Sequence, residues 1–141
     1  MSQPSDSRDI KGLFVLNEGQ MDKNKCSLDY FDYTAGKFYN NLFAAINPDV
    51  TLGLGDTGND LKVYEGRLYA VINGSGLIEV MDARTLRHVG SVALAGCRCI
   101  AFNGNKAYVT SYSGEMDENT KLQKGTLAEM DLDLLKITRT C

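Results

Sequence analysis

The stretch Arg67-Leu-Tyr-Ala-Val-Ile-Asn-Gly-Ser-Gly-Leu-Ile-Glu-Val-Met-Asp82 decides the fold, because the chain carries two further versions of it. Each version has a short apolar run, a break, and a second apolar run that ends in aspartate. The other versions are Gly12-Leu-Phe-Val-Leu-Asn17 with Ser27-Leu-Asp-Tyr-Phe-Asp32, and Lys106-Ala-Tyr-Val-Thr-Ser111 with Thr126-Leu-Ala-Glu-Met-Asp131. The closing aspartates, Asp32, Asp82 and Asp131, are 50 and 49 residues apart, and short β runs that recur at this interval are typical of propeller blades.

We therefore predict an all-β fold, a partial β-propeller of about three blades, each a four-stranded antiparallel sheet. Blade 1 is expected at about residues 12–43, blade 2 at 58–93 and blade 3 at 97–140. Residues 10–141 then form the partial propeller, and the polar residues 1–9 form a disordered tail. Blade 1 lacks an evident first strand, which would have to come from Ile10 and the tail or from elsewhere. A single helical turn is expected around residues 42–46.

The connections between the apolar runs lead to three local predictions. Asn73-Gly74 is typical of a type I′ hairpin turn, because that turn needs positive φ. Asp82 opens a turn in which its carboxylate can accept hydrogen bonds from backbone N–H groups. The polar stretch 113–125 of blade 3 is expected to be a long loop.

Composition argues against some classes of protein. The net charge of −3 and the pI near 5.1 argue against a nucleic-acid partner, which selects a basic surface. No apolar run approaches the roughly 18 residues that span a bilayer. The first nine residues carry no apolar core of a signal peptide. We expect a cytosolic protein or the mature part of an exported one.

The four cysteines, Cys26, Cys97, Cys99 and Cys141, include no Cys-x-x-Cys pair, and His88 is the only histidine. Free thiols are the favoured interpretation, with a disulfide and, more remotely, a metal site as alternatives. We expect neither a metal nor a cofactor.

Two motifs suggest other functions. Gly53-Leu-Gly-Asp-Thr-Gly58 fits the dinucleotide pattern G-x-G-x-x-G, but a strand rather than a helix is expected to follow it, so no cofactor is predicted. Asp56-Thr57-Gly58 has the spelling of the aspartic-protease triplet, which needs two copies to share a proton between carboxylates. A homodimeric aspartic protease is therefore a distant alternative. We predict no catalytic residues, since His88 is expected on an outer strand, far from Asp56 and Asp60.

Polar residues gather at the strand ends of the repeat. The first strand of a blade begins at the edge where the second strand ends, because the two are antiparallel. We expect these residues to ring the mouth of the channel. The favoured interpretation is that they hydrogen-bond loop backbones and cap the blade ends, and the alternative is that they contact a ligand. The candidate ligand-binding residues are Asn17, Glu18, Asn59, Asp60, Asn73, Arg98, Ser111 and Tyr112.

Four segments also carry a family resemblance. Gly12-Leu-Phe-Val-Leu-Asn-Glu-Gly19, Leu54-Gly-Asp-Thr-Gly-Asn-Asp60, Tyr69-Ala-Val-Ile-Asn-Gly-Ser75 and Ala107-Tyr-Val-Thr-Ser-Tyr112 follow one another at blade spacing. In this the chain resembles the surface-layer, YncE-like β-propellers of gut Bacteroidetes, over about residues 10–140. Members of that family tend to have Pro before the Arg that opens a blade, where this chain has Cys97 before Arg98.

The resemblance implies a function that the residues alone do not. The family fold has seven blades, its members are typically exported lipoproteins, and some capture vitamin B12 and pass it to an outer-membrane transporter. The chain is accordingly expected to be a non-enzymatic binding protein of the cell surface or periplasm, with a corrinoid as ligand and such a transporter as partner. The alternative is a protein–protein interaction propeller without a small ligand.

Three blades leave one sheet face bare at each end of the row. Blade 1 carries Leu13, Val15 and Phe31, and blade 3 carries Leu127, Met130, Leu135 and Ile137, so both end faces are expected to be apolar. Large exposed apolar patches usually mark a partner or aggregation. We expect self-association, or missing blades supplied by another chain.

Overall fold

The computed structural model describes residues 10–141, and the tail predicted at residues 1–9 lies outside the described part of the chain. Within residues 10–141, eleven strands and one short helix follow one another. The elements are β1 (Gly12–Asn17), β2 (Ser27–Asp32), β3 (Lys37–Tyr39), α1 (Leu42–Ile46), β4 (Gly58–Tyr64), β5 (Arg67–Ile72), β6 (Leu77–Asp82), β7 (His88–Ala93), β8 (Cys97–Asn103), β9 (Lys106–Met116), β10 (Gln123–Asp131) and β11 (Lys136–Thr140).

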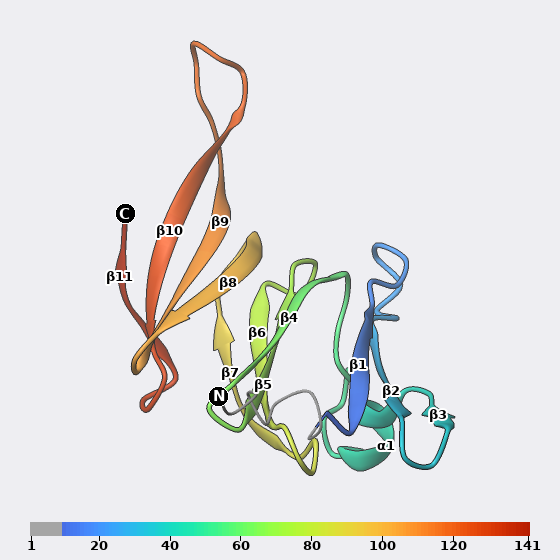
Figure 1. Ribbon diagram of the computed structural model, residues 1–141. Coiled ribbons are helices and arrows are strands. Elements are labelled where there is room, and N and C mark those ends of the chain that lie inside the picture. Colours follow the sequence, from blue (N-terminus) through green and yellow to red (C-terminus); the bar gives the residue numbers. More distant parts are fainter. Residues whose placement is uncertain (1–9) are drawn as a thin grey trace, which may run out of the picture.

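The strands form three antiparallel sheets that stand in chain order, as Figure 1 shows. Blade 1 is β1-β2-β3, blade 2 is β4-β5-β6-β7, and blade 3 is β8-β9-β10-β11. The predicted fold class, an all-β partial propeller, is confirmed. Blade 1 has three strands, and within residues 10–141 no strand pairs with the free edge of β1. The expected helical turn is α1, which packs on β2 and buries Phe43.

Strand β5 shows how one blade serves two cores. Successive side chains of a strand point to opposite faces, and both faces of β5 are buried. Leu68, Ala70 and Ile72 belong to an apolar cluster between blades 1 and 2, whereas Tyr69 and Val71 belong to a cluster between blades 2 and 3. Burial of a side chain such as Leu68 or Ile72 stabilises the folded state by about 1.5–3 kcal/mol. The faces between blades are therefore the hydrophobic core.

The two clusters draw on every blade. The cluster between blades 1 and 2 consists of Cys26, Leu28, Phe43, Leu54, Leu68, Ala70, Ile72, Met81 and Leu86. The cluster between blades 2 and 3 consists of Tyr69, Val71, Ile78, Val80, Val92, Cys97, Ile100, Ala107, Val109, Met130 and Leu132.

The predicted type I′ turn after β5 is wrong. The loop between β5 and β6 has four residues, and its one positive φ, 64°, is at Gly76 rather than at Asn73 or Gly74. The N–H of Gly76 donates to the carbonyl of Asn73 at 3.1 Å. Four-residue hairpin loops are usually built around a type I turn, and Gly76 supplies the left-handed residue that closes this one.

The predicted loop at residues 113–125 is also wrong, because this stretch extends the β9–β10 hairpin into an arm. The two strands pair as far as Met116 and Gln123, and the N–H of Asp117 donates to the carbonyl of Leu122 at 2.7 Å. The arm projects beyond the rest of blade 3 (Figure 1). Its polar composition reflects exposure on both faces rather than an absence of strand structure.

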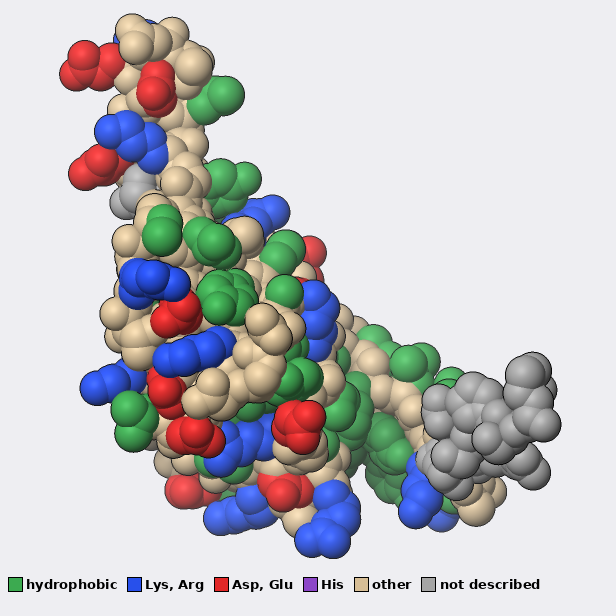
Figure 2. Space-filling view, turned by 60° about the vertical axis from the view of Figure 1, so that its left-hand side comes forward, with side chains coloured by type: hydrophobic (Ala, Val, Ile, Leu, Met, Phe, Trp, Pro, Cys, Tyr) green, Lys and Arg blue, Asp and Glu red, His purple; other side chains and the backbone are tan. Residues whose placement is uncertain are grey.

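The end face of blade 3 differs from expectation. Met130 is fully buried, and Leu135 and Ile137 pack against the cluster between blades 2 and 3, so these three residues lie on the inner face. The outer face carries acidic and basic side chains with apolar ones among them, as Figure 2 shows, and Leu127 is exposed on it as predicted. Glu129 lies 2.9 Å from Arg139 and 3.8 Å from Lys106, which also lies 3.4 Å from Asp131.

The end face of blade 1 is apolar, as the sequence predicts. Leu13 and Phe38 flank Phe31 in the register of the sheet, and all three point away from blade 2. Tyr33 meets Phe31 edge-on, with ring centroids 5.4 Å apart. The two ends of the row are therefore unlike: blade 1 presents apolar side chains, and blade 3 presents ion pairs beside the exposed Leu127.

Candidate functional site

The candidate rim is the edge where β4 and β8 begin, where β5 ends, and where β9 passes Ser111 before it continues into the arm. The side-chain amide of Asn73 donates to the carbonyl of Cys97 at 2.8 Å, and that of Asn59 donates to the carbonyl of Arg98 at 2.6 Å. These bonds place Asn73 and Arg98 at one edge, as the antiparallel geometry predicts. They also link blade 2 to blade 3.

Strand β8 accepts these side chains because it is an edge strand of blade 3, so one row of its backbone groups has no partner within the sheet. Its register against β9 shifts between Cys97 and Ile100, and such a bulge disrupts the ladder locally. The carboxylate of Asp60 accepts the Ile100 N–H at 2.9 Å, and the ammonium of Lys62 donates to the Ile100 carbonyl. Asn59, Asp60 and Asn73 thus hydrogen-bond backbone, which is the favoured of the two interpretations of the sequence.

On blade 1 the rim residues stay within their own sheet. The amide of Asn17 donates to Asp29 at 2.6 Å and to the Ser27 hydroxyl at 3.1 Å, across the β1–β2 pair. Asp29 is buried and also accepts the Asn41 N–H at 2.8 Å. The carbonyl of Glu18 accepts the Gly58 N–H at 3.1 Å, which joins the end of β1 to the start of β4.

On blade 3 the rim divides into a buried half and an exposed half. The buried hydroxyl of Ser111 pairs with that of Thr126. Arg98 and Tyr112 are exposed, and the guanidinium carbon of Arg98 lies 5.5 Å from the centre of the Tyr112 ring. Tyr112 is held in place because its N–H donates to the carbonyl of Gly96 at 3.1 Å.

The rim therefore has a fixed frame and an open surface. Five of the eight candidate residues, Asn17, Asn59, Asp60, Asn73 and Ser111, have side chains engaged in hydrogen bonds inside the protein. Glu18, Arg98 and Tyr112 turn exposed side chains to solvent. Blade 3 thus offers a ligand a cation and an aromatic ring, and blade 1 offers a carboxylate.

Asp56 is used structurally. One of its carboxylate oxygens accepts the Asp22 N–H at 3.0 Å, and the other accepts the Thr57 hydroxyl at 3.1 Å. The Asp56 N–H donates to the Ser75 hydroxyl at 2.8 Å. These contacts tie the segment before β4 to two neighbouring loops. The glycine pattern at residues 53–58 leads into strand β4, as expected, and not into a helix.

Sequence reasoning missed a buried polar cluster beneath α1. Glu79 is 3% exposed, points to the blade 1 side of β6 and contacts Nδ1 of His88. The His88 N–H donates to the Asn47 side chain at 2.8 Å, whose amide donates to the carbonyl of Leu86 at 2.8 Å. Burial raises the pKa of Glu79, although the contact with His88 opposes the shift. The sequence feature that could have revealed this cluster is the glutamate between Leu77 and Met81, on the same face of the strand as these two apolar residues.

The cysteines form no cluster. All four are free thiols, and burial raises the pKa of Cys26 and of Cys97 to about 11. Among the described residues, no group of three or more His, Cys, Asp or Glu side chains is placed to hold a metal ion. Within the same part of the chain, no helix is both long and apolar enough to cross a membrane.

Comparison with known proteins supports the fold and leaves the activity open. The family described as "domain of unknown function (DUF5074)" matches residues 11–129. No curated protein matches the sequence. Hydrazine synthase of Kuenenia stuttgartiensis has a similar structure, with a TM-score of 0.60 and 15% sequence identity over 92% of this chain. The chain spans 32% of that structure's chain. At this identity the likeness concerns the propeller-like β-fold alone.

Proposed function

The chain belongs to the DUF5074 family, whose description assigns no activity, and we propose that it is a non-enzymatic binding protein of the propeller type that acts at the cell envelope. The observation that carries the binding role is the exposed Arg98–Tyr112 pair on the rim. The envelope location and the ligand class rest on the resemblance to the surface-layer, YncE-like propellers.

The rim suits a flat, polyamide ligand such as a corrinoid. The Tyr112 ring offers a stacking surface, and Arg98 offers N–H donors to amide carbonyls or to a phosphate. The hydrogen bonds of Asn59 and Asn73 hold β8 beneath this pair, so little ordering accompanies binding. Handover of the ligand to an outer-membrane transporter is the partner relation that follows from the same resemblance.

The test is a titration of the chain with cyanocobalamin, in which binding is measured by calorimetry and by the absorption spectrum of the ligand. Tyr112→Ala and Arg98→Ala should each weaken binding about tenfold, since each removes about 1.4 kcal/mol of stacking or charge-assisted contact. Arg139→Ala is the matched control, because Arg139 is an exposed arginine on an outer strand. No binding up to about 1 mM, or equal loss in the control, contradicts the ligand assignment.

The non-enzymatic part has its own test. If Asp56 served a homodimeric aspartic protease, the protein would cleave peptides at acid pH, and Asp56→Asn would abolish the cleavage. The carboxylate contacts to Asp22 and Thr57 favour a structural role instead. We expect no pepstatin-sensitive cleavage from the wild-type protein.

The second candidate function is a protein–protein interaction propeller without a small ligand. The β9–β10 arm favours it, because Met116 and Leu122 are exposed near the tip. A propeller of this kind would bind no corrinoid and would lose a protein partner when both residues are replaced by Ser. The cyanocobalamin titration therefore separates the two candidates.

A further inference from the structure

The two junctions between blades have equivalent grooves at the edge opposite the rim, where β1, β5 and β9 begin. Between blades 2 and 3 the groove has a volume of about 450 Å³. Arg67 crosses it, because its guanidinium donates to the carbonyl of Leu132 at 2.9 Å. The Tyr64 ring stacks on Phe102 with centroids 4.4 Å apart, and its hydroxyl donates to the Gly104 carbonyl at 2.8 Å. Side chains thus bridge this junction.

Between blades 1 and 2 the counterpart of the Arg67 bond is missing, and the guanidinium of Arg87 donates instead to the carbonyl of Ile46 at 2.8 Å. In the sequence repeat, Gly12 occupies the position of Arg67, and Ala83 occupies that of Leu132. A side chain at position 12 would collide with the Tyr30 ring and with the Phe31 carbonyl, so glycine is what lets Tyr30 lie across β1. The groove here is larger, at about 630 Å³, within the range of small-molecule sites.

The floor and the mouth of this groove differ in chemistry. Apolar and aromatic side chains form the floor: Phe14, Tyr30, Leu42, Ile46, Val63 and Leu86. Two exposed cations, Lys11 and Arg84, line the groove as well. Among residues 10–141 neither cation takes part in an ion pair. The nearby Asp82 carboxylate accepts the backbone N–H groups of Arg84 and Thr85.

We propose that this groove binds an amphipathic carboxylate, with an acyl chain on the apolar floor and the carboxylate between Lys11 and Arg84. The charge pattern selects an anion, since Lys11 and Arg84 border an apolar surface and the nearby Asp82 carboxylate is already engaged by the backbone N–H groups of Arg84 and Thr85. Helix α1 contributes Leu42 and Ile46 to the floor, and blades 2 and 3 have no counterpart of this helix within the described residues.

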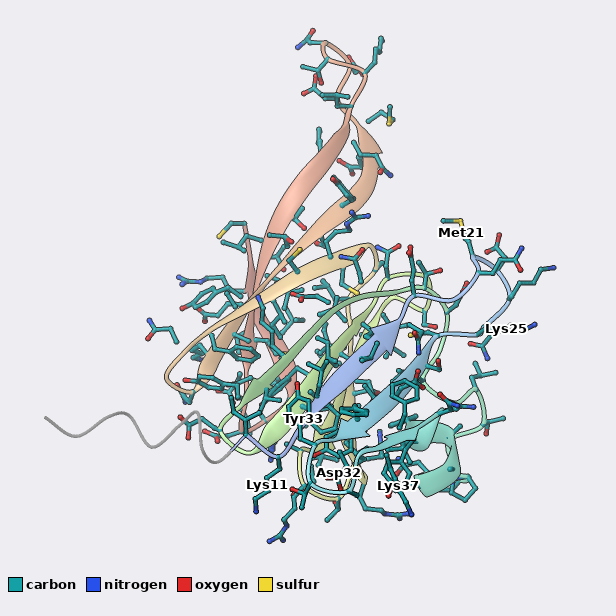
Figure 3. All side chains as sticks on the ribbon, turned by 45° about the vertical axis from the view of Figure 1, so that its right-hand side comes forward. Lys11, Met21, Lys25, Asp32, Tyr33 and Lys37 are labelled. Carbon is teal, nitrogen blue, oxygen red and sulfur yellow. The ribbon has the colours of Figure 1, made fainter. Side chains whose placement is uncertain are left out.

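The groove is separate from the rim. Strand β1 runs from Gly12 at the groove to Asn17 at the rim, and β4 runs the opposite way to Val63. Figure 3 shows Lys11 at one end of blade 1, and Met21 and Lys25 in the loop at the other end. Binding here and corrinoid binding at the rim can therefore be gained or lost independently.

The experiment is a calorimetric titration of the whole chain with dodecanoate, held below its micelle concentration. Val63→Asp places a carboxylate in the groove, and its matched control is Val89→Asp on β7; the two valines are 57% and 44% exposed. We expect at least about a tenfold loss of affinity for Val63→Asp and no loss for the control. Lys11→Glu with Arg84→Glu should cause a similar loss, while thermal unfolding followed by circular dichroism stays cooperative in every variant.

A second titration separates the effect of the ligand's charge from that of its apolar chain. Dodecyltrimethylammonium has the same chain and the opposite charge, so we expect it to bind at least about tenfold more weakly than dodecanoate. Equal binding of the two probes would overturn the proposal, as would equal affinities of Val63→Asp and Val89→Asp. So would a failure of the folded wild-type chain to bind dodecanoate at all.

Discussion

At the scale of single residues, the closing aspartate of the repeat performs one task three times. Asp32, Asp82 and Asp131 each accept the N–H groups two and three residues further on, at 2.8–3.0 Å. Asp117 does the same at the tip of the arm. The sequence predicted this for Asp82 because the motif needs only neighbouring residues and no tertiary partner.

The turn of Asp82 gives a stability prediction. Both N–H donors reach the same oxygen, Oδ1, so Asp82→Asn keeps both bonds and Asp82→Ala loses them. We expect Asp82→Ala to lower the urea midpoint at neutral pH with an unchanged slope, and Asp82→Asn to preserve most of it. Equal midpoints for Asp82→Ala and the wild type would show that these bonds contribute nothing net.

The same turn predicts a pH dependence. The hydrogen bonds from Thr85 and Arg84 lower the pKa of Asp82 in the folded state. Its contribution is therefore present above the unfolded pKa of about 3.9 and is lost as pH falls through the folded pKa. Wild type should lose more stability than Asp82→Asn on acidification, measured by urea unfolding between neutral and acid pH. A constant difference would contradict the assignment.

Glu79 predicts the opposite sign. Burial raises its folded pKa, so the unfolded chain ionises first and the folded state loses stability as pH rises from about 4.3 to the folded pKa. Glu79→Gln should therefore become more stable relative to wild type as pH rises through this window. Glu129→Gln is the control, because the Thr138 hydroxyl and Arg139 lower the pKa of Glu129. The wild type should therefore become more stable relative to Glu129→Gln as pH rises. The same sign for both variants would exclude burial as the cause.

At the scale of elements, how much the sequence predicts depends on whether a strand is buried. Strand β5 can be predicted from the sequence because Leu68 to Ile72 is a continuous apolar run, as expected when both faces of a strand are covered. The arm could not be predicted, since a hairpin that is exposed on both faces has no alternation of apolar and polar residues. The face of Met130 was also assigned wrongly, because only its pairing with Ala107 places it toward blade 2.

The arm predicts a local effect only. Its residues belong to neither core cluster, so replacing residues 115–124 by a short glycine turn should change the free energy of unfolding by no more than about 0.5 kcal/mol. Urea unfolding gives that number, and amide exchange should show the arm opening well before the blades. A loss above about 2 kcal/mol would mean that the arm supports blade 3.

At the scale of the whole molecule, the row of blades has a direction. Leu13, Val15 and Phe31 keep the apolar character of a face that receives another blade, whereas at the other end Glu129 and Arg139 form an ion pair beside Leu127. The repeat could not predict this asymmetry. The repeat predicts which side chains a blade buries against its neighbours. The two outermost faces have no neighbour within the described chain, so their residues can depart from the repeat.

This asymmetry names the face through which the chain should self-associate or receive further blades. An apolar face pairs best with another apolar face, so the assembly should depend on blade 1 and respond weakly to salt. Leu13→Asp should dissociate it to a 15.5 kDa species in sedimentation at low micromolar concentration. Leu127→Asp is the control on blade 3, since Leu13 and Leu127 are 52% and 42% exposed. The prediction fails if the wild-type chain already sediments as one 15.5 kDa species with a cooperative melt and no dye-binding apolar surface, because blade 1 would then tolerate water without a partner.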